Sequence, residues 1–271
     1  MTTLQKVIKY LAMAFAVFLA VSIIGGILGA VGLFGGLLGG DAVAEDVKTY
    51  AVSSDVSRLE VEINAADFTI KQGESFSVES NLKHLTVADK NGVLTIKETK
   101  TFGSTYTGAV LTLYIPVDTV FEKANITTGA GRLTADTLSA DALKLELGAG
   151  EVNIGSLTAL SRADIEGGAG KLTISGGALA DLDLQMGVGQ LNLASALTGN
   201  CEIETGVGEA NITVLGSKED YKLDIEKGIG SITVDGKSAS DFGSSGSGQH
   251  AIQIDCGVGA VHIAFKEEQA K

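Results

Sequence analysis

A strand, a Gly-x-Gly turn and a second strand recur seven times between residues 124 and 263, and this repeat limits the fold more than any other feature. The first glycines of successive turns are separated by 19, 20, 19, 19, 22 and 29 residues. Self-similarity at a period near 20 residues is typical of a solenoid, in which each coil is stabilised mainly by its neighbours. The turns begin at Gly129, Gly148, Gly168, Gly187, Gly206, Gly228 and Gly257.

Positions counted from the first glycine of each turn indicate which side chains face inward. Positions −5, −3 and −1 are mainly apolar, as in Leu143, Leu145 and Leu147, whereas positions −4 and −2 are polar. After the turn, the apolar positions are +4 and +6, as in Val152 and Ile154. This period of two predicts strands with one buried face on each side of the turn.

The residue between the two glycines is always Ala, Val or Ile, so the inward positions are expected to switch from odd to even numbers across the second glycine. We expect a corner there, because glycine reaches positive φ without a Cβ clash. Two or three short strands per coil, stacked about 4.8 Å apart, would enclose a side-chain-filled interior. The sequence therefore predicts an all-β parallel β-solenoid (β-helix), with regular coils over residues 121–265.

Residues 57–120 are expected to be irregular N-terminal strands of the same domain, which would then cover 57–265. Residues 64–70 resemble a degenerate copy of the turn and its following strand, and Asn91-Gly92 predicts a hairpin. Residues 99–108 are expected to form a loop, and the glycine- and serine-rich residues 243–248 a flexible loop inserted between two coils. Residues 266–271 form a polar tail.

Residues 11–40 contain no charged side chain and are long enough to cross a hydrocarbon core of about 30 Å as a helix. Lys6 and Lys9 precede this span and acidic residues follow it, so residues 1–10 are expected to be cytoplasmic and the repeats extracytoplasmic. Residues 41–56 would be a linker. A cleaved signal peptide is the alternative, because Ala42-Val43-Ala44 resembles a cleavage site, but the apolar stretch exceeds the usual 7 to 15 residues.

The composition excludes some partners. The net charge of −13 opposes binding to a phosphate backbone, and 5% aromatic residues without Trp offer few stacking platforms, so no nucleic-acid partner is expected. Cys201 and Cys256 occupy inward positions −5 and −1 of coils that are expected to be two apart in the stack. At that separation they are too distant for a disulfide, so two buried free thiols are predicted.

The sequence predicts no catalytic residue, no cofactor and no firm metal site. Gly167 to Lys171 resembles a phosphate-binding loop, but Leu172 stands where Ser or Thr should hold magnesium. His84, His250 and His262 lie in different coils without the spacing of zinc ligands. Solvent-facing histidines are the better interpretation.

The outward columns at −4 and −2 are acidic in most coils, and stacked carboxylates repel by about 1 kcal/mol per neighbouring pair in water. Position +3 instead alternates in sign through Arg132, Glu151 and Lys171, so the fold does not require an acidic column. Binding of calcium or of a cationic peptide is one hypothesis, and an ordinary solvated face is the other. The candidate residues are Asp164, Asp183, Glu202, Glu204, Asp224 and Glu226. The last five of these are expected to project from three successive coils of one face.

The chain resembles a known family in residues 111–116 (Leu-Thr-Leu-Tyr-Ile-Pro), in residues 124–131 (Ala-Asn-Ile-Thr-Thr-Gly-Ala-Gly) and in the repeats that follow. Over residues 50–265 it is similar to the bacterial putative-adhesin family of β-strand-repeat proteins, a domain of unknown function. The resemblance implies a right-handed β-solenoid at a bacterial envelope, with some relatives linked to envelope-stress responses. It supplies no catalytic residues.

We therefore expect a non-enzymatic, membrane-anchored module that acts as an adhesin, an envelope scaffold or a stress sensor, with an envelope polymer, cationic peptide or protein as partner. One alternative is a polysaccharide-acting β-helix enzyme, although the acidic face has few of the basic partners such a site uses. Another is a self-assembling structural β-helix like the bactofilins. Those are cytoplasmic, which the charge asymmetry around residues 11–40 opposes.

Overall fold

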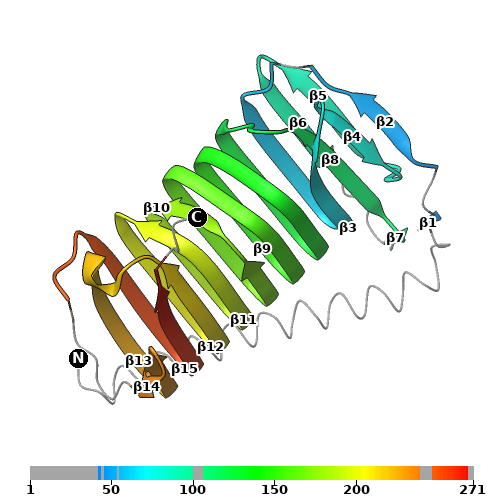
Figure 1. The fold of residues 1–271 in the computed structure, drawn as a ribbon. Helices are drawn as coiled ribbons and strands as arrows, with labels where there is room; N and C mark the ends of the chain where they lie inside the picture. Colours follow the sequence, from blue (N-terminus) through cyan, green and yellow to red (C-terminus); the bar gives the residue numbers. More distant parts are fainter. Residues whose placement is uncertain (1–41, 44–45, 54, 100–105, 239–245, 268–271) are drawn as a thin grey trace.

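The computed structural model describes residues 42–43, 46–53, 55–99, 106–238 and 246–267. Over these residues the chain is built of β-strands with one short 3₁₀ turn, and a 13-stranded sheet winds into a stack of coils (Figure 1). The predicted all-β solenoid is confirmed. The elements are β1 (Ala42–Val43), β2 (Lys48–Ala51), β3 (Arg58–Gly73), β4 (Ser77–Ser80), β5 (Leu85–Lys90), β6 (Val93–Glu98), β7 (Tyr106–Thr107), β8 (Val110–Pro116), β9 (Phe121–Ile174), β10 (Gly177–Ala180), β11 (Leu182–Thr198), β12 (Asn200–Leu215), η1 (Lys218–Asp220), β13 (Tyr221–Val234), β14 (Lys237–Ser238) and β15 (His250–Lys266).

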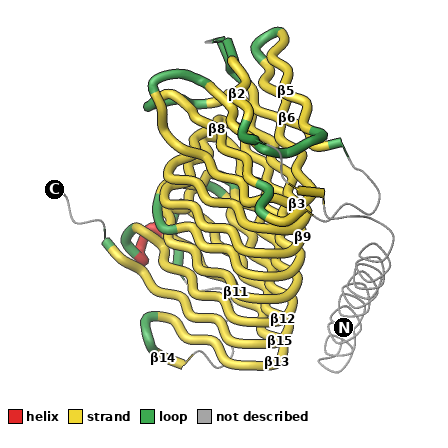
Figure 2. Tube along the Cα trace, turned by 90° about the vertical axis from the view of Figure 1, so that its right-hand side faces the viewer, coloured by secondary structure: helices red, strands yellow, loops and turns green. Residues whose placement is uncertain are grey.

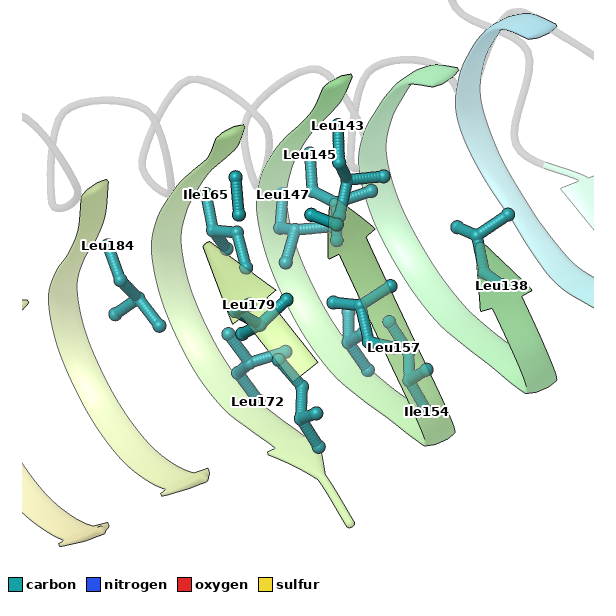
Figure 3. Close-up of a cluster of buried hydrophobic side chains, with 14 of the residues drawn as sticks. Leu138, Leu143, Leu145, Leu147, Ile154, Leu157, Ile165, Leu172, Leu179 and Leu184 are labelled. Atoms are coloured by element: carbon teal, nitrogen blue, oxygen red, sulfur yellow. The ribbon is translucent and has the colours of Figure 1, made fainter. Parts of the chain in front are cut away.

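Coils stack in parallel register, so that equivalent inward residues lie on top of one another. Leu184 of β11, for example, pairs with Ile165 of the preceding coil and with Ile203 of the next. Figure 3 shows Leu145, Leu157 and the neighbouring leucines filling the interior from all sides of the coils. Because burying one such side chain contributes about 1.5–3 kcal/mol, the stacked columns supply most of the driving force for folding.

The corner at each Gly-x-Gly turn is confirmed by backbone geometry. The second glycine has a positive φ in all seven turns, between 127° and 147°. A Cβ added to Gly150 would lie 1.9 Å from the carbonyl oxygen of Gly131 in the preceding coil. Glycine is therefore required at the second position of the turn for two reasons, the positive φ of the backbone and the close approach of two coils.

The residue between the glycines, expected to continue the inward positions, is buried in none of the seven turns: it is exposed at three corners and part-buried at the other four. Ala149 is exposed, and Ile229 of the outermost coil is 49% exposed. This expectation was wrong because all three residues of the turn form the corner, and the inward pattern resumes only at position +4.

The coils at the C-terminal end do not stack in sequence order. β15, the last strand of the chain, lies between β12 and β13 and pairs in parallel with both (Figures 1 and 2). The expected sequential order was therefore wrong here. Residues 243–248, which were expected to form a loop between successive coils, belong instead to the connection between β13 and β15. This connection leads from the outermost coil, that of β13, back to the neighbouring coil of β15. Its residues 239–245 lie outside the described part of the chain.

The two cysteines consequently lie in adjacent coils, not two coils apart. Cys201 pairs with Ile252, and Cys256 pairs with Thr205, so the two remain four residues apart along the strands. Both are buried and free, as predicted. Burial raises the pKa of both thiols, which disfavours the reactive thiolate form.

Residues 57–120 cap the first coil. β3 is in register with the first regular coil, with Ala65 opposite Ala130, so the degenerate repeat copy is confirmed. The other edge of β3 pairs with β6 and β8, and β4 and β2 continue the sheet. The Asn91-Gly92 hairpin is also confirmed, because both residues have positive φ and join antiparallel β5 and β6.

Three other expectations concern the ends and loops of the chain. Part of the expected linker 41–56 forms β2, and β1 pairs with β7 in the segment expected to be a loop. Within the described ranges, no helix is long and apolar enough to cross a membrane. The proposed anchor over residues 11–40, residues 1–10 and most of the tail lie outside those ranges.

A buried carboxylate closes the capped end of the stack. Glu98, which is 4% exposed, accepts hydrogen bonds from the backbone N–H groups of Asn64 (2.7 Å) and Ala65 (3.3 Å). These two donors belong to the corner of β3. Glu98 therefore provides at this corner the acceptor that a further coil would otherwise supply.

The corner geometry predicts that Gly150→Ala will destabilise the fold. Backbone strain at a positive-φ position costs about 1–3 kcal/mol, and the contact with Gly131 adds to it. Gly176→Ala is the control, because its Cβ would lie 3.4 Å from the nearest atom and its φ is not positive. Thermal unfolding should show a clearly lower Tm for Gly150→Ala, and equal Tm values would contradict the corner assignment.

Glu98→Ala should also lower the stability, because it leaves the part-buried N–H groups of Asn64 and Ala65 without this acceptor, which costs about 1–3 kcal/mol. Glu122→Ala is the matched control, since Glu122 is exposed and makes one surface ion pair, with Arg58 at 3.3 Å. Denaturant titration of the two variants should separate them, with Glu122→Ala within about 0.5 kcal/mol of the parent. A larger loss for Glu122→Ala would refute the capping role of Glu98.

Candidate functional site

The strand that precedes each corner presents a predominantly acidic surface, which we call the acidic face. Its side chains occupy positions −4 and −2 and alternate with the buried residues of the same strands, so the strand geometry sends them all outward. In the order of the stack the carboxylates are Glu146, Asp164, Glu166, Asp183, Glu202, Glu204, Asp255, Asp224 and Glu226. The face thus runs across β9, β11, β12, β15 and β13.

The sequence-predicted residues are brought together only in part. Asp183 lies between Asp164 and Glu202 in register, so these three carboxylates form a continuous column at position −4. Glu202 and Glu204, however, do not neighbour Asp224 and Glu226, because β15 lies between them. The prediction of three successive coils was wrong for this reason.

The inserted strand β15 supplies the missing neighbours. Gln253 separates Glu202 from Asp224, and Asp255 separates Glu204 from Glu226. The column at −4 is therefore interrupted by a neutral amide, whereas the column at −2 is acidic over its last three coils. The sequence places Asp255 at the outward position −2 of its repeat. Its neighbouring carboxylates, however, follow only from the order of the strands.

Basic side chains compensate the first coils of the acidic face. Lys144 Nζ lies 2.8 Å from Glu146 Oε1 and 3.7 Å from Glu166 Oε1, and the Arg162 guanidinium lies 3.8 Å from Asp183. The hydrogen bond from Lys144, followed by that from the Thr127 hydroxyl, holds the pKa of Glu146 below its ordinary value. These pairs are exposed to solvent, so each contributes little to stability.

Three carboxylates in the later coils form the densest acidic group among the described residues. One oxygen each from Glu202, Glu204 and Asp255 can be chosen so that all three lie within 4.8 Å of one another. Oxygen ligands of this kind suit calcium, which usually takes six to eight of them. Three carboxylates on an open sheet do not amount to a complete calcium site.

The remaining sequence candidates do not form a chemical site in the described part of the chain. His250 Nδ1 accepts the Gly199 N–H and His262 Nδ1 lies 2.8 Å from Thr233 Oγ1, so each has a structural partner. Gly167 to Lys171 is a repeat corner within β9 and does not lead into a helix, as a phosphate-binding loop would. At position +3, Arg132 Nε lies 3.4 Å from Glu151 Oε2, as the alternating signs predicted.

A shallow pocket opens at the corner of the central coils. Leu147, Gly148, Gly168 and Met186 line it, and its volume of about 20 Å³ suffices for a single water molecule. Gly167 also lines the pocket, at the position −1 that Leu147 and Met186 occupy in the neighbouring coils. The pocket is too small for a sugar or a nucleotide.

These observations define the class of the protein as a solenoid with an acidic face. Among the described residues, the side chains do not assemble into a catalytic group. The chain belongs to the Toastrack DUF4097 family, which matches residues 56–264. No curated protein matches the chain.

Three solved structures are similar to this chain at low sequence identity. A putative adhesin from Bacteroides fragilis NCTC 9343 is 12% identical with a TM-score of 0.45, over 83% of this chain and 99% of that one. A putative cell adhesion protein from Clostridium sporogenes ATCC 15579 is 15% identical with a TM-score of 0.39, over 82% and 99%. A putative lipid binding protein from Parabacteroides distasonis ATCC 8503 is 14% identical with a TM-score of 0.37, over 82% and 99%.

Proposed function

We propose that this chain is a non-enzymatic, membrane-anchored β-solenoid whose acidic face binds a cationic partner outside the cytoplasm. The partner would be a Lys- and Arg-rich peptide or protein segment, or a divalent cation that bridges the face to an anionic envelope polymer. The module would then act in adhesion or as an envelope scaffold or sensor. The observation that carries this proposal is the concentration of nine carboxylates on one face of five strands.

The fold itself does not account for this concentration of charge. On the neighbouring face, position +3 pairs Arg132 with Glu151, so the same coils can carry compensated columns. On the acidic face, basic partners contact Glu146, Glu166 and Asp183. Farther along the stack, Glu202, Glu204 and Asp255 bring three carboxylates within 4.8 Å of one another. A cationic ligand would relieve like-charge repulsion at this group, and such charge complementarity also accelerates association.

Two features weigh against the alternative functions. A polysaccharide-acting β-helix enzyme would need acidic and basic groups gathered in a groove, whereas the acidic group lies on an open sheet face. End-to-end stacking of the bactofilin type needs free coil edges, whereas β8, β4 and β2 cover the N-terminal edge and Glu98 closes its corner.

The proposed location rests on the uncharged residues 11–40 and on the lysines that precede them. Protease added to intact cells with a permeable wall should digest the β-strand domain, while a tag on residues 1–10 should survive until the cells are lysed. Protection of the domain until lysis would contradict an extracytoplasmic location.

Binding to the acidic face should raise the stability of the folded chain by RT ln(1 + [L]/Kd), about 2.7 kcal/mol at one hundred times Kd. We expect millimolar calcium or oligolysine to raise the Tm of the full chain in mild detergent at constant ionic strength. The triple variant Glu202→Gln, Glu204→Gln, Asp255→Asn should lose this response. Differential scanning calorimetry with and without the ligand measures both effects.

The control removes two carboxylates from the other face, through Glu151→Gln and Glu209→Gln, and should retain the response. If sodium chloride at matched ionic strength raises the Tm as much as calcium does, simple screening explains the effect and the binding proposal fails. An equal response in the triple variant and the control variant would likewise refute the assignment to this face.

A further inference from the structure

The last strand of the chain fills a slot between two strands that precede it in sequence. β15 pairs with β12 along one edge and with β13 along the other, and the corner glycines Gly208, Gly259 and Gly230 are aligned across the three coils. Strand β13 must therefore leave room for a coil that is synthesised after it. In a solenoid whose coils stack in sequence order, by contrast, each new coil pairs with the free edge of the coil that precedes it in sequence.

β13 and β15 carry the same inward pattern, so either fits the edge of β12. The inward residues Leu223, Ile225, Ile232 and Val234 of β13 match Ile252, Ile254, Val261 and Ile263 of β15 in register, and all eight are buried. Their corners have the same sequence, Gly-x-Gly, with a positive φ at the second glycine. When β15 leaves the slot, β13 can close directly on β12 without a change of register.

The contacts that select β15 for the slot lie at its two ends. At the start of β15, the Gly199 N–H donates to His250 Nδ1 (3.0 Å), and the Ala251 N–H donates to the Gly199 carbonyl (2.9 Å). At its end, the Phe265 N–H donates to Asp235 Oδ1 (3.1 Å). Tyr221 of β13 packs its ring against both His250 and Phe265, with centroid separations of 5.7 and 5.5 Å. All of these contacts are made by residues of β13 and β15 and by Gly199 and Asp235, which directly precede β12 and follow β13.

The connection from β13 to β15 comprises residues 235–249, which is fifteen residues. Fully extended, a segment of this length reaches about 50 Å. Within one molecule it must return from Val234, at the end of β13, to His250, which pairs with Tyr221 at the start of β13. The bent β13 of 14 residues spans less than about 46 Å, so the connection can cover this distance to the slot of its own molecule or to that of an adjacent copy.

We propose that the slot between β12 and β13 also accepts β15 from a second copy of this chain, so that two copies exchange their C-terminal coils. Each copy then makes the same contacts as before, and the main opposing term is the entropy of association. Insertion within one chain is favoured by a high effective concentration, so exchange increases with protein concentration and with shortening of the connection. This interaction needs no ligand at the acidic face, although the exchanged β15 carries Asp255, one of its three clustered carboxylates.

Variants with one introduced cysteine, in a chain whose Cys201 and Cys256 are replaced by alanine, test the exchange, because Asn211 on β12 and His262 on β15 are register partners. Full-length Asn211→Cys and His262→Cys copies are mixed, unfolded, refolded together in detergent and oxidised. Exchange predicts a disulfide-linked dimer between the two variants. Its yield should be roughly tenfold above a mixture of Thr69→Cys with His262→Cys, since Thr69 occupies the same outward column at the far end of the stack.

Two further chains make the result decisive. A single chain carrying both Asn211→Cys and His262→Cys should form an intramolecular disulfide, which checks that β15 lies against β12. Deleting residues 240–245 leaves nine residues in the connection and should increase the dimer yield. Dimer yields equal to those of the Thr69 mixture, with either connection length, would overturn the proposal. Failure of the double variant to form its disulfide would overturn the strand order on which it rests.

Discussion

The close contact between the corner of one coil and the backbone of the preceding coil is the constraint on which the rest of the structure depends. At Gly148, Gly168, Gly187 and Gly206, an added Cβ would lie between 2.1 and 2.5 Å from a glycine carbonyl oxygen of the coil beneath. Backbone thus lies against backbone along one edge of the solenoid. This contact fixes the register, and the register in turn aligns the buried leucines and the outward carboxylates.

Much of the fold could be predicted from the sequence because its determinants are local. The alternation around Leu145 and Ile154 identifies strands, the glycine pairs identify corners, and Asn91-Gly92 identifies a hairpin. Each of these depends on a few neighbouring residues and on steric rules that hold in any coil. The degenerate copy at Ala65 was visible for the same reason.

The order of the last coils could not be predicted, because β13 and β15 satisfy the same pattern. The contacts that distinguish them, such as Asp235 with Phe265 and Tyr221 with His250, join residues 29 or 30 positions apart and follow no repeat rule. This ambiguity carried over to the acidic face, where Asp224 was expected in the place that Gln253 takes. The surface position of Ile229 was also missed, since an apolar residue in a corner has the same pattern as a buried one.

The insertion of β15 also has a mechanical consequence. When the last strand of a solenoid lies at its outer edge, a force on the C-terminus peels it away from one neighbour, one hydrogen bond after another. A force applied to this chain beyond Lys266 instead loads β15 along its length, against β12 and β13 together. Tension at the C-terminus is therefore shared between two rows of parallel hydrogen bonds, and the solenoid resists unravelling from the end formed by its last coils.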